Sequence, residues 1–216
     1  MYFVLPYDRL LDYPHLASQM YKLRERVFCQ ELGWVEVDGD EERDLYDDCA
    51  PSYIMHTDES ATHLYAAARL MPTTGPTLLA DVFADTIPDI DFQSPFVWEI
   101  TRLAVDDDLI DAHGLSHRRF AILRNMLLAG MEFGVAHGIE AFLANFDEAR
   151  LRMWRRLGAR FDVIGTSHAF STTVHLGLIE SSPETLVALR TRLGTTQPVL
   201  GPIPATTPAR PVKAAA

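Results

Sequence analysis

The stretch VWEITRLAV, residues 97–105, is typical of a buried β-strand, because large apolar and β-branched residues fill it. Two charged residues, Glu99 and Arg102, interrupt it. A charge inside an apolar strand is costly unless it is paired or faces a cleft. Because the two residues are an odd number apart, a regular strand would point them to opposite faces of its sheet. Either a β-bulge lies between them, or they serve different surfaces.

Arg69 raises the same question in the preceding apolar stretch HLYAAARL, residues 63–70. In one interpretation, Arg69, Glu99 and Arg102 form a structural ion pair. In the other, they line a cleft in which a ligand binds. The pattern of residues leaves both interpretations open.

Around these strands, the periodicity of apolar residues predicts an uneven alternation of helices and strands. We expect helices at residues 15–31, 116–137, 147–157 and 184–193. We expect strands at residues 53–57, 63–70, 78–83, 97–105, 139–146, 160–165 and 172–179. Gly33, Gly138 and Gly158 are placed to end the first three helices. This order predicts an α/β fold in which helices sandwich a mixed sheet.

The chain divides into a folded part and a tail. The tail, residues 194–216, is rich in Pro, Thr and Ala and lacks apolar periodicity. We therefore expect one domain, residues 1–193, followed by a segment that is extended or disordered.

Composition excludes several classes of protein. A net charge of −11 disfavours nonspecific binding to nucleic acid, which needs a positive surface. The apolar runs are far shorter than a membrane span, and the N-terminus lacks the basic region of a secretory signal. Neither of the common Gly-rich nucleotide-binding patterns is present. We expect a cytoplasmic protein in which Cys29 and Cys49 are free thiols.

Two further clusters have the residue types of a binding site. Arg24 and Phe28 share one helix face, and Trp34 follows the helix end, so the three could receive a cationic, partly apolar ligand. Asp44 and Asp47 lie three apart in an acidic loop and could bind an ammonium group, a ribose or a metal. Taken singly, the aromatic residues are more often core and the acids more often solvated. No histidine lies at metal-ligand spacing, so we expect no metal.

Together these residues resemble the eight-residue signature of the acyl-homoserine-lactone synthase (autoinducer synthase) family. The matching motifs are R-x-x-V-F-x-x-x-L-G-W, D-x-Y-D, R-L-x-P-T-T-G and W-E-x-x-R-x-A-V, and the resemblance covers about residues 20–158. The eight residues, in order and at near-identical spacing, are Arg24, Phe28, Trp34, Asp44, Asp47, Arg69, Glu99 and Arg102.

The resemblance implies a fold similar to that of the N-acetyltransferase (GNAT-like) superfamily, with a sheet split into a V. It implies that S-adenosylmethionine and an acyl thioester are the substrates, with acyl carrier protein or coenzyme A carrying the acyl group. The products would be an N-acyl-homoserine lactone and methylthioadenosine. S-adenosylmethionine is then a substrate, and we expect no cofactor.

Resemblance and physical chemistry together suggest a role for each residue. Glu99 would be the catalytic base that removes a proton from the amine, because burial raises a carboxylate pKa towards neutrality. The pocket for S-adenosylmethionine would be formed by Arg24, Phe28 and Trp34. A linked charge network would hold that pocket in shape, consisting of Asp44, Asp47, Arg69 and Arg102.

A basic helix near residue 150 has two interpretations. Related synthases are thought to dock the acidic carrier protein there, and opposite charges would steer it. The docking residues would be Arg150, Arg152, Arg155 and Arg156. Alternatively, these arginines pair with Asp147 and Glu148 on an ordinary surface helix, and the sequence favours neither interpretation.

Two rival functions remain. An ordinary acyl-CoA N-acyltransferase would carry a Gly-rich turn at the start of a helix, and the corresponding stretch DAHGLSHRRF lacks its pair of glycines. A non-catalytic acyl or nucleoside sensor would bind its ligand equally well with Gln at position 99.

Overall fold

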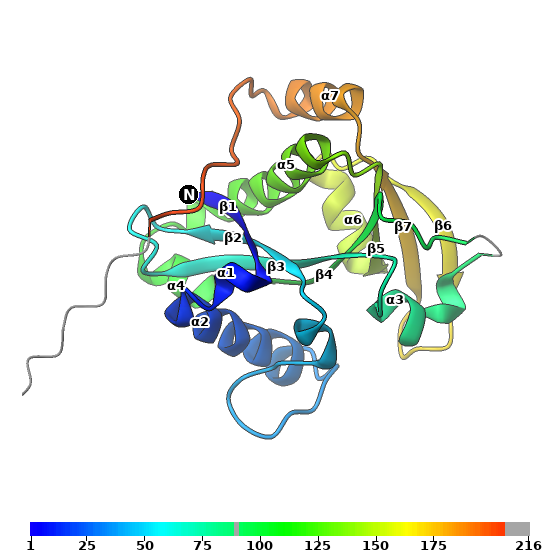
Figure 1. Cartoon of the computed structure of the whole chain (residues 1–216), viewed down its shortest axis with the longest axis horizontal. Helices are drawn as coiled ribbons and strands as arrows, with labels where there is room; N and C mark the ends of the chain where they lie inside the picture. The colour runs from blue at the N-terminus through cyan, green and yellow to red at the C-terminus, as the bar shows by residue number, and fades with distance from the viewer. Residues whose placement is uncertain (89–90, 206–216) are drawn as a thin grey trace, which may run out of the picture.

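The computed structural model describes residues 1–88 and 91–205. A seven-stranded sheet in the order β1-β2-β3-β4-β5-β7-β6 has helices on both faces (Figure 1). The strands are β1 (Tyr2–Pro6), β2 (Ser52–Thr57), β3 (Leu64–Pro72), β4 (Val97–Val105), β5 (Ala141–Asp147), β6 (Asp162–Ser167) and β7 (Val174–Glu180). The α-helices are α1 (Tyr7–Leu10), α2 (Pro14–Arg24), α3 (Leu78–Asp81), α4 (Asp107–Ala112), α5 (Arg119–His137), α6 (Glu148–Arg156) and α7 (Pro183–Leu193). A π-helix, η1 (Glu25–Glu31), continues α2, and the short 3-10 helices are η2 (Leu45–Asp48), η3 (Ala84–Thr86) and η4 (Ser116–Arg118).

The sheet opens into a V between β4 and β5, as expected from the resemblance. These two strands are the parallel pair of the sheet, and they pair only from Val97 to Glu99 with Ala141 to Leu143. Beyond that point both strands continue without pairing to each other, and Figure 1 shows them diverging. The predicted mixed, V-split sheet between helices is confirmed.

A β-bulge in β4 answers the question posed by the spacing of Glu99 and Arg102. Ala67 pairs with Ala104 and Arg69 with Thr101, so one residue of β3 lies opposite two residues of β4. Arg102 is one of these two and has a φ of 53°, which few residues other than glycine adopt. The extra residue returns Arg102 to the face of the sheet that holds Glu99.

The two faces of the sheet pack against different elements. On the α5 face, Ile100 and Leu103 of β4 pack into the largest apolar core. On the α2 face, Ala104 packs with Leu23 and Phe28. The functional side chains of β3 and β4 therefore project between the sheet and the segment that contains α2 and the acidic loop.

Several elements differ from the sequence-based expectation. Residues 78–83, expected as a strand, contain the short helix α3, because the Thr77 side chain accepts the Ala80 N–H and caps it. β1, α1 and α4 were not expected from the sequence, where Pro6 interrupts the short apolar stretch that contains β1. β1 is nevertheless an edge strand, where proline is tolerated.

The segment after α7 runs in extended form across α5 to the edge of the sheet as far as residue 205 (Figure 1). Buried Glu132 of α5 accepts the backbone N–H groups of Val199 at 3.0 Å and Leu200 at 2.8 Å. The Gly201 N–H donates to the Tyr2 carbonyl at 2.7 Å. Residues 206–216, the rest of the expected tail, lie outside the described residues.

Candidate active site

Three arginines and three carboxylates form one largely buried ion network on the α2 face of the sheet. The arginines come from α2, β3 and the bulge of β4. The segment between η1 and β2, which includes η2, supplies all three carboxylates. The members are Arg24, Arg69, Arg102, Glu42, Asp44 and Asp47. Because the charges of the two signs balance, each buried charge has a partner.

Arg24 connects the acidic loop to α2. Its two terminal nitrogens donate to both carboxylate oxygens of Asp47, at 2.8 and 2.9 Å, and its Nε donates to Glu42. Only 1% of Arg24 is exposed. A bidentate pair fixes both partners in orientation as well as in distance. Arg24 is therefore a structural anchor whose guanidinium is inaccessible to a ligand.

Arg69 and Arg102 complete the network from the sheet. Arg69 donates to Asp47 at 3.0 Å and to Asp44 at 3.1 Å. Arg102 donates to Glu42 at 3.0 Å and to Asp44 at 3.1 Å. The side chains of Arg102 and Asp44 are 13% and 18% exposed, whereas that of Arg69 is fully buried. Arg102 and Asp44 thus form the side of the network that a ligand can reach.

Glu42 belongs to the network but was not identified from the sequence. It is fully buried and binds both Arg24 and Arg102. Burial alone would raise the pKa of Glu42, but the two guanidinium groups hold the pKa below its usual value. In the sequence it is one of several acids in DGDEERDLYDD. Nothing in that run distinguishes it from a solvated carboxylate.

Phe28 and Trp34 form an aromatic wall beside the accessible side of the network. Their ring centroids are 6.2 Å apart, and the Arg102 guanidinium carbon lies 5.2 Å from the centre of the Phe28 ring. Phe28 is buried, while Trp34 is 49% exposed. The pair therefore combines an anchored ring with an accessible one. This arrangement suits a ligand that carries both a cationic and an apolar part.

Glu99 stands apart from the ion network although it lies on the same face. Its carboxylate accepts the backbone N–H groups of Leu78 at 3.1 Å and Leu79 at 2.6 Å, at the start of α3. Burial raises the pKa of Glu99 to about 7, against the opposing effect of these N–H groups and of the arginines. Arg69 and Arg102 pair with the loop carboxylates instead, so Glu99 is not their ion-pair partner. Its carboxyl group is therefore able to exchange a proton near neutral pH.

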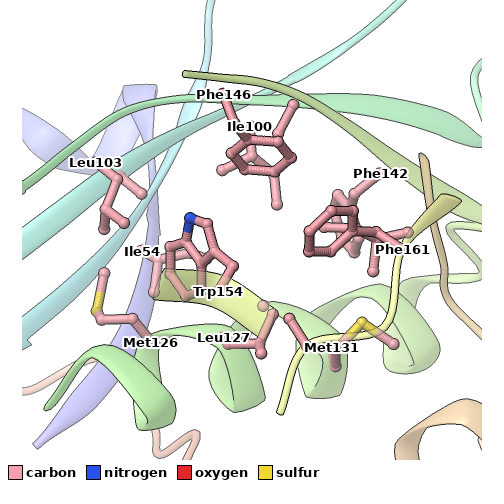
Figure 2. A pocket seen from close by; sticks show the side chains of 15 residues that line it. Ile54, Ile100, Leu103, Met126, Leu127, Met131, Phe142, Phe146, Trp154 and Phe161 are labelled. Carbon is pink, nitrogen blue, oxygen red and sulfur yellow. The ribbon is translucent and has the colours of Figure 1, made fainter. Parts of the chain in front are cut away.

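An apolar pocket lies on the opposite, α5 face of the sheet, beside the split (Figure 2). Every residue that lines it is apolar or aromatic. β4, α5, β5 and α6 all contribute, and Phe161 comes from the chain before β6. The lining includes Ile100, Leu103, Met131, Phe142, Ala144, Trp154 and Phe161. The pocket suits a hydrocarbon chain.

The arginines of α6 fall into two groups. Arg150 donates to Asp147 at 2.6 Å, and its guanidinium carbon lies 5.0 Å from the centre of the Trp34 ring. Arg152 pairs with Glu148 at 3.2 Å. These two arginines make the ion pairs that the alternative interpretation of this helix expected.

The other two arginines, Arg155 and Arg156, are exposed. The Arg155 guanidinium carbon lies 5.7 Å from the centre of the Phe161 ring. With Arg152, which is also exposed, they form a positive surface at the C-terminal part of α6. This surface lies on the helix that contributes Trp154 to the apolar pocket.

Three general features complete the description. Within residues 1–88 and 91–205, no group of three or more His, Cys, Asp or Glu side chains is arranged to hold a metal ion. No helix of that same part is long and apolar enough to cross a membrane. Cys29 and Cys49 are free thiols.

Replacing Arg24 with alanine should lower the free energy of unfolding by about 3–5 kcal/mol, because it removes one of the two guanidinium partners of each of two buried carboxylates. Arg43→Ala is the matched control, since Arg43 forms an exposed pair with Asp48. The control should change stability by less than about 1 kcal/mol. Urea unfolding followed by circular dichroism measures both. Equal effects of the two substitutions would show that the network contributes no more than a surface pair.

Comparison with known proteins identifies relatives over nearly the whole chain. The family model described as autoinducer synthase matches residues 9–189. An acyl-homoserine-lactone synthase from Rhizobium etli is 28% identical over 94% of this chain and 94% of its own length. A probable acyl-homoserine-lactone synthase from Sinorhizobium fredii is 31% identical over 84% of this chain and 88% of its own length.

Solved structures agree with this assignment. TofI, in a ternary complex with an inhibitor and MTA, is 28% identical with a TM-score of 0.68, covering 88% of this chain and 96% of that one. The CoA-dependent synthase BjaI, with SAM and isopentyl-CoA, shares the fold at 23% identity and a TM-score of 0.75, with 93% and 92% covered. A putative N-acetyltransferase from Lactobacillus plantarum shares it at 16% identity and a TM-score of 0.51, with 84% and 97% covered. The chain therefore belongs to the autoinducer synthase family and is an acyl-homoserine-lactone synthase, an acyltransferase with a GNAT-like fold.

Proposed function

We propose that this chain makes an N-acyl-homoserine lactone from S-adenosylmethionine and an acyl thioester by means of the residues described above. The observation that carries the proposal is the position of Glu99. Its buried carboxyl group, with a pKa of about 7, lies at the point where β4 and β5 separate. The ion network and the aromatic wall lie on its own face of the sheet, and the apolar pocket lies on the other.

S-adenosylmethionine would bind against the aromatic wall and the accessible side of the ion network. Its sulfonium and adenine would lie against Phe28 and Trp34, because an aromatic face attracts a cation and stacks on a purine ring. Its carboxylate would approach Arg102 and its amine Asp44, the two network residues with accessible side chains. Asp47, Arg69 and fully buried Arg24 would hold these groups in place without touching the ligand.

The acyl chain would occupy the apolar pocket, and the thioester would lie in the opening between β4 and β5. Such a position brings the thioester carbon near the amine that attacks it, an effect of proximity. Ala144 lines the pocket and offers no hydrogen bond to the chain. The pocket thus favours an acyl group without polar substituents over the part that it encloses.

The first step forms the amide. Glu99 accepts a proton from the substrate ammonium, directly or through a water, and the free amine then attacks the thioester carbon. The new C–N bond forms as the C–S bond breaks, and the thiol leaves with a proton. The carboxylates of Glu42 and Asp47 are poor candidates for this base, because bound guanidinium groups lower the pKa of each.

The second step closes the lactone. The carboxylate of the methionyl group attacks its own γ-carbon, a C–O bond forms, and the bond from that carbon to sulfur breaks to release methylthioadenosine. The positive sulfur leaves as a neutral thioether, so the main contribution of the protein is to hold the folded conformer. Both steps use only the two substrates, and we propose no cofactor. We place the reaction in the cytoplasm.

Mass spectrometry of culture extract from a host that expresses this chain tests the function. An N-acyl-homoserine lactone should appear, and the purified enzyme should release methylthioadenosine and a free thiol in equal amounts. Catalytically inactive protein with the same fold is the control. Thioester hydrolysis without lactone would contradict the proposal.

Glu99→Gln should lower the rate of amide formation by about 100- to 10,000-fold, the usual contribution of a general base. For the wild type, kcat/KM should rise with pH through about 7, because the raised pKa leaves Glu99 protonated and inactive at lower pH. That limb of the pH profile should disappear in the variant. Thiol release measures the rate, and calorimetry should show that S-adenosylmethionine still binds.

Glu140→Gln is the control for this experiment, since Glu140 is exposed and precedes β5. It should keep both the rate and the pH profile. If Glu99→Gln released thiol at the wild-type rate, Glu99 would not be the catalytic base. Its role would then be structural, through its hydrogen bonds to the start of α3.

We propose acyl carrier protein as the donor, docked on the positive surface of Arg152, Arg155 and Arg156, with coenzyme A as the alternative. Reversing these three residues to glutamate should raise KM for the carrier protein and leave KM for S-adenosylmethionine nearly unchanged. The effect should shrink as salt increases, because exposed charges are screened over about 8–10 Å.

Reversal of Arg9, Arg43 and Arg119 is the matched control. It changes the net charge equally at three exposed positions elsewhere. Steady-state kinetics at low salt compares the two variants. If both raised KM for the carrier equally, net charge rather than α6 would govern docking. If neither did, either the carrier would dock elsewhere or the donor would be an acyl-CoA.

A further inference from the structure

Arg150 contacts the aromatic wall from the other side of the sheet split. Its guanidinium carbon is 5.0 Å from the centre of the Trp34 ring, within the range of a cation–π contact. Trp34 belongs to the segment after η1, and Arg150 belongs to α6, which follows β5. The contact therefore joins two halves of the molecule that the diverging β4 and β5 hold apart.

The position of Arg150 is fixed from its own side by Asp147, the N-cap of α6. Asp147 accepts the Arg150 backbone N–H at 2.7 Å and the Arg150 Nη1–H at 2.6 Å. The side chain of Asp147 is only 14% exposed. An arginine held at both its backbone and its guanidinium has lost much of its freedom before it meets Trp34. The contact with Trp34 therefore costs little additional side-chain entropy.

α6 also contributes to the acyl pocket. Trp154 lies one turn after Arg150, on the same side of the helix, and its ring lines the apolar pocket of Figure 2. A shift of α6 that accompanies filling of that pocket would therefore move Arg150 relative to Trp34. α6 therefore contacts both of the proposed substrate sites, through Arg150 and through Trp154.

We propose that Arg150 is a positioning residue that holds Trp34 over the S-adenosylmethionine site and couples that site to the acyl pocket through α6. The proposal rests on the proposed function and refines it. It removes Arg150 from the surface that would dock a carrier protein, because its guanidinium is engaged by Trp34 and Asp147. If a filled acyl pocket seats α6 so that Arg150 holds Trp34, binding of the donor favours binding of S-adenosylmethionine, and by reciprocity the converse holds.

Arg150→Gln tests the proposal, because glutamine keeps a polar side chain but loses the charge and the planar cation. KM for S-adenosylmethionine should rise about two- to fivefold, the range that an exposed cation–π contact implies. The kcat should stay nearly unchanged, as should KM for the acyl donor measured at low S-adenosylmethionine concentration. In the wild type, KM for S-adenosylmethionine should fall as the donor concentration increases, and this dependence should weaken in the variant. Arg150→Lys should restore part of the affinity, because it keeps the charge without the planar stack.

Arg119→Gln is the matched control, since Arg119 also pairs with an aspartate at the start of a helix. It should leave all three quantities unchanged. ¹⁹F NMR of protein labelled with 5-fluorotryptophan observes the contact directly and requires no turnover. The Trp34 resonance, assigned with Trp34→Phe, should shift in Arg150→Gln and not in Arg119→Gln.

Two results would overturn the proposal. A Trp34 resonance that is unchanged in Arg150→Gln would show that the two side chains do not interact in solution. An increase in KM for the donor, with KM for S-adenosylmethionine unchanged, would assign Arg150 to donor docking. Failure of the proposed function is distinguishable from both, because it would appear as absence of lactone from the wild type while the resonance still shifts.

Discussion

The buried ion network is the constraint on which the rest of the site depends. Three arginines from α2, β3 and β4 bind three carboxylates of a single loop, so helix, sheet and loop are fixed relative to one another. Taking so many charges out of water is expensive, and the attraction between them repays it only in good geometry. The segment between η1 and β2 is thereby held against α2 and the sheet, on the side where Phe28 lies beside Arg102.

Stability and catalysis make opposite demands on the carboxylates of this face. Glu42 and Asp47 have a lowered pKa, so the stability that they contribute is present above the pKa of the unfolded chain and is lost as pH falls through the folded value. Glu99 has a pKa raised to about 7, so the folded state binds more protons than the unfolded one between about pH 4.3 and 7. Its contribution to stability therefore declines as pH rises over that interval. Glu99 is therefore deprotonated, and able to act as a base, in the pH range in which it no longer stabilises the folded state.

The sequence was sufficient for the architecture and most of the network, but not for the features that depend on long-range contacts. Apolar periodicity located β3, β4 and α5, and Gly138 located the end of α5. α3 was mistaken for a strand because its start is determined by the side chains of Thr77 and Glu99, the second of which lies in β4. Glu42 was missed because burial distinguishes it from its acidic neighbours, and burial comes from packing between distant segments. The contact of Arg150 with Trp34 has the same origin.

The bulge at Arg102 also limits how this enzyme can be recombined with its relatives. Up to Thr101, the odd-numbered residues of β4 lie on the α2 face of the sheet. After the bulge, the even-numbered residues lie on that face. Consider a chimera joined within residues 101–104 to a relative that lacks the extra residue. Every β4 side chain beyond the junction would turn to the opposite face of the sheet. Leu103 would then replace Ala104 against α2, and a polar residue would enter the acyl pocket. Junctions placed before Val97 or after Val105 would keep the alternation intact.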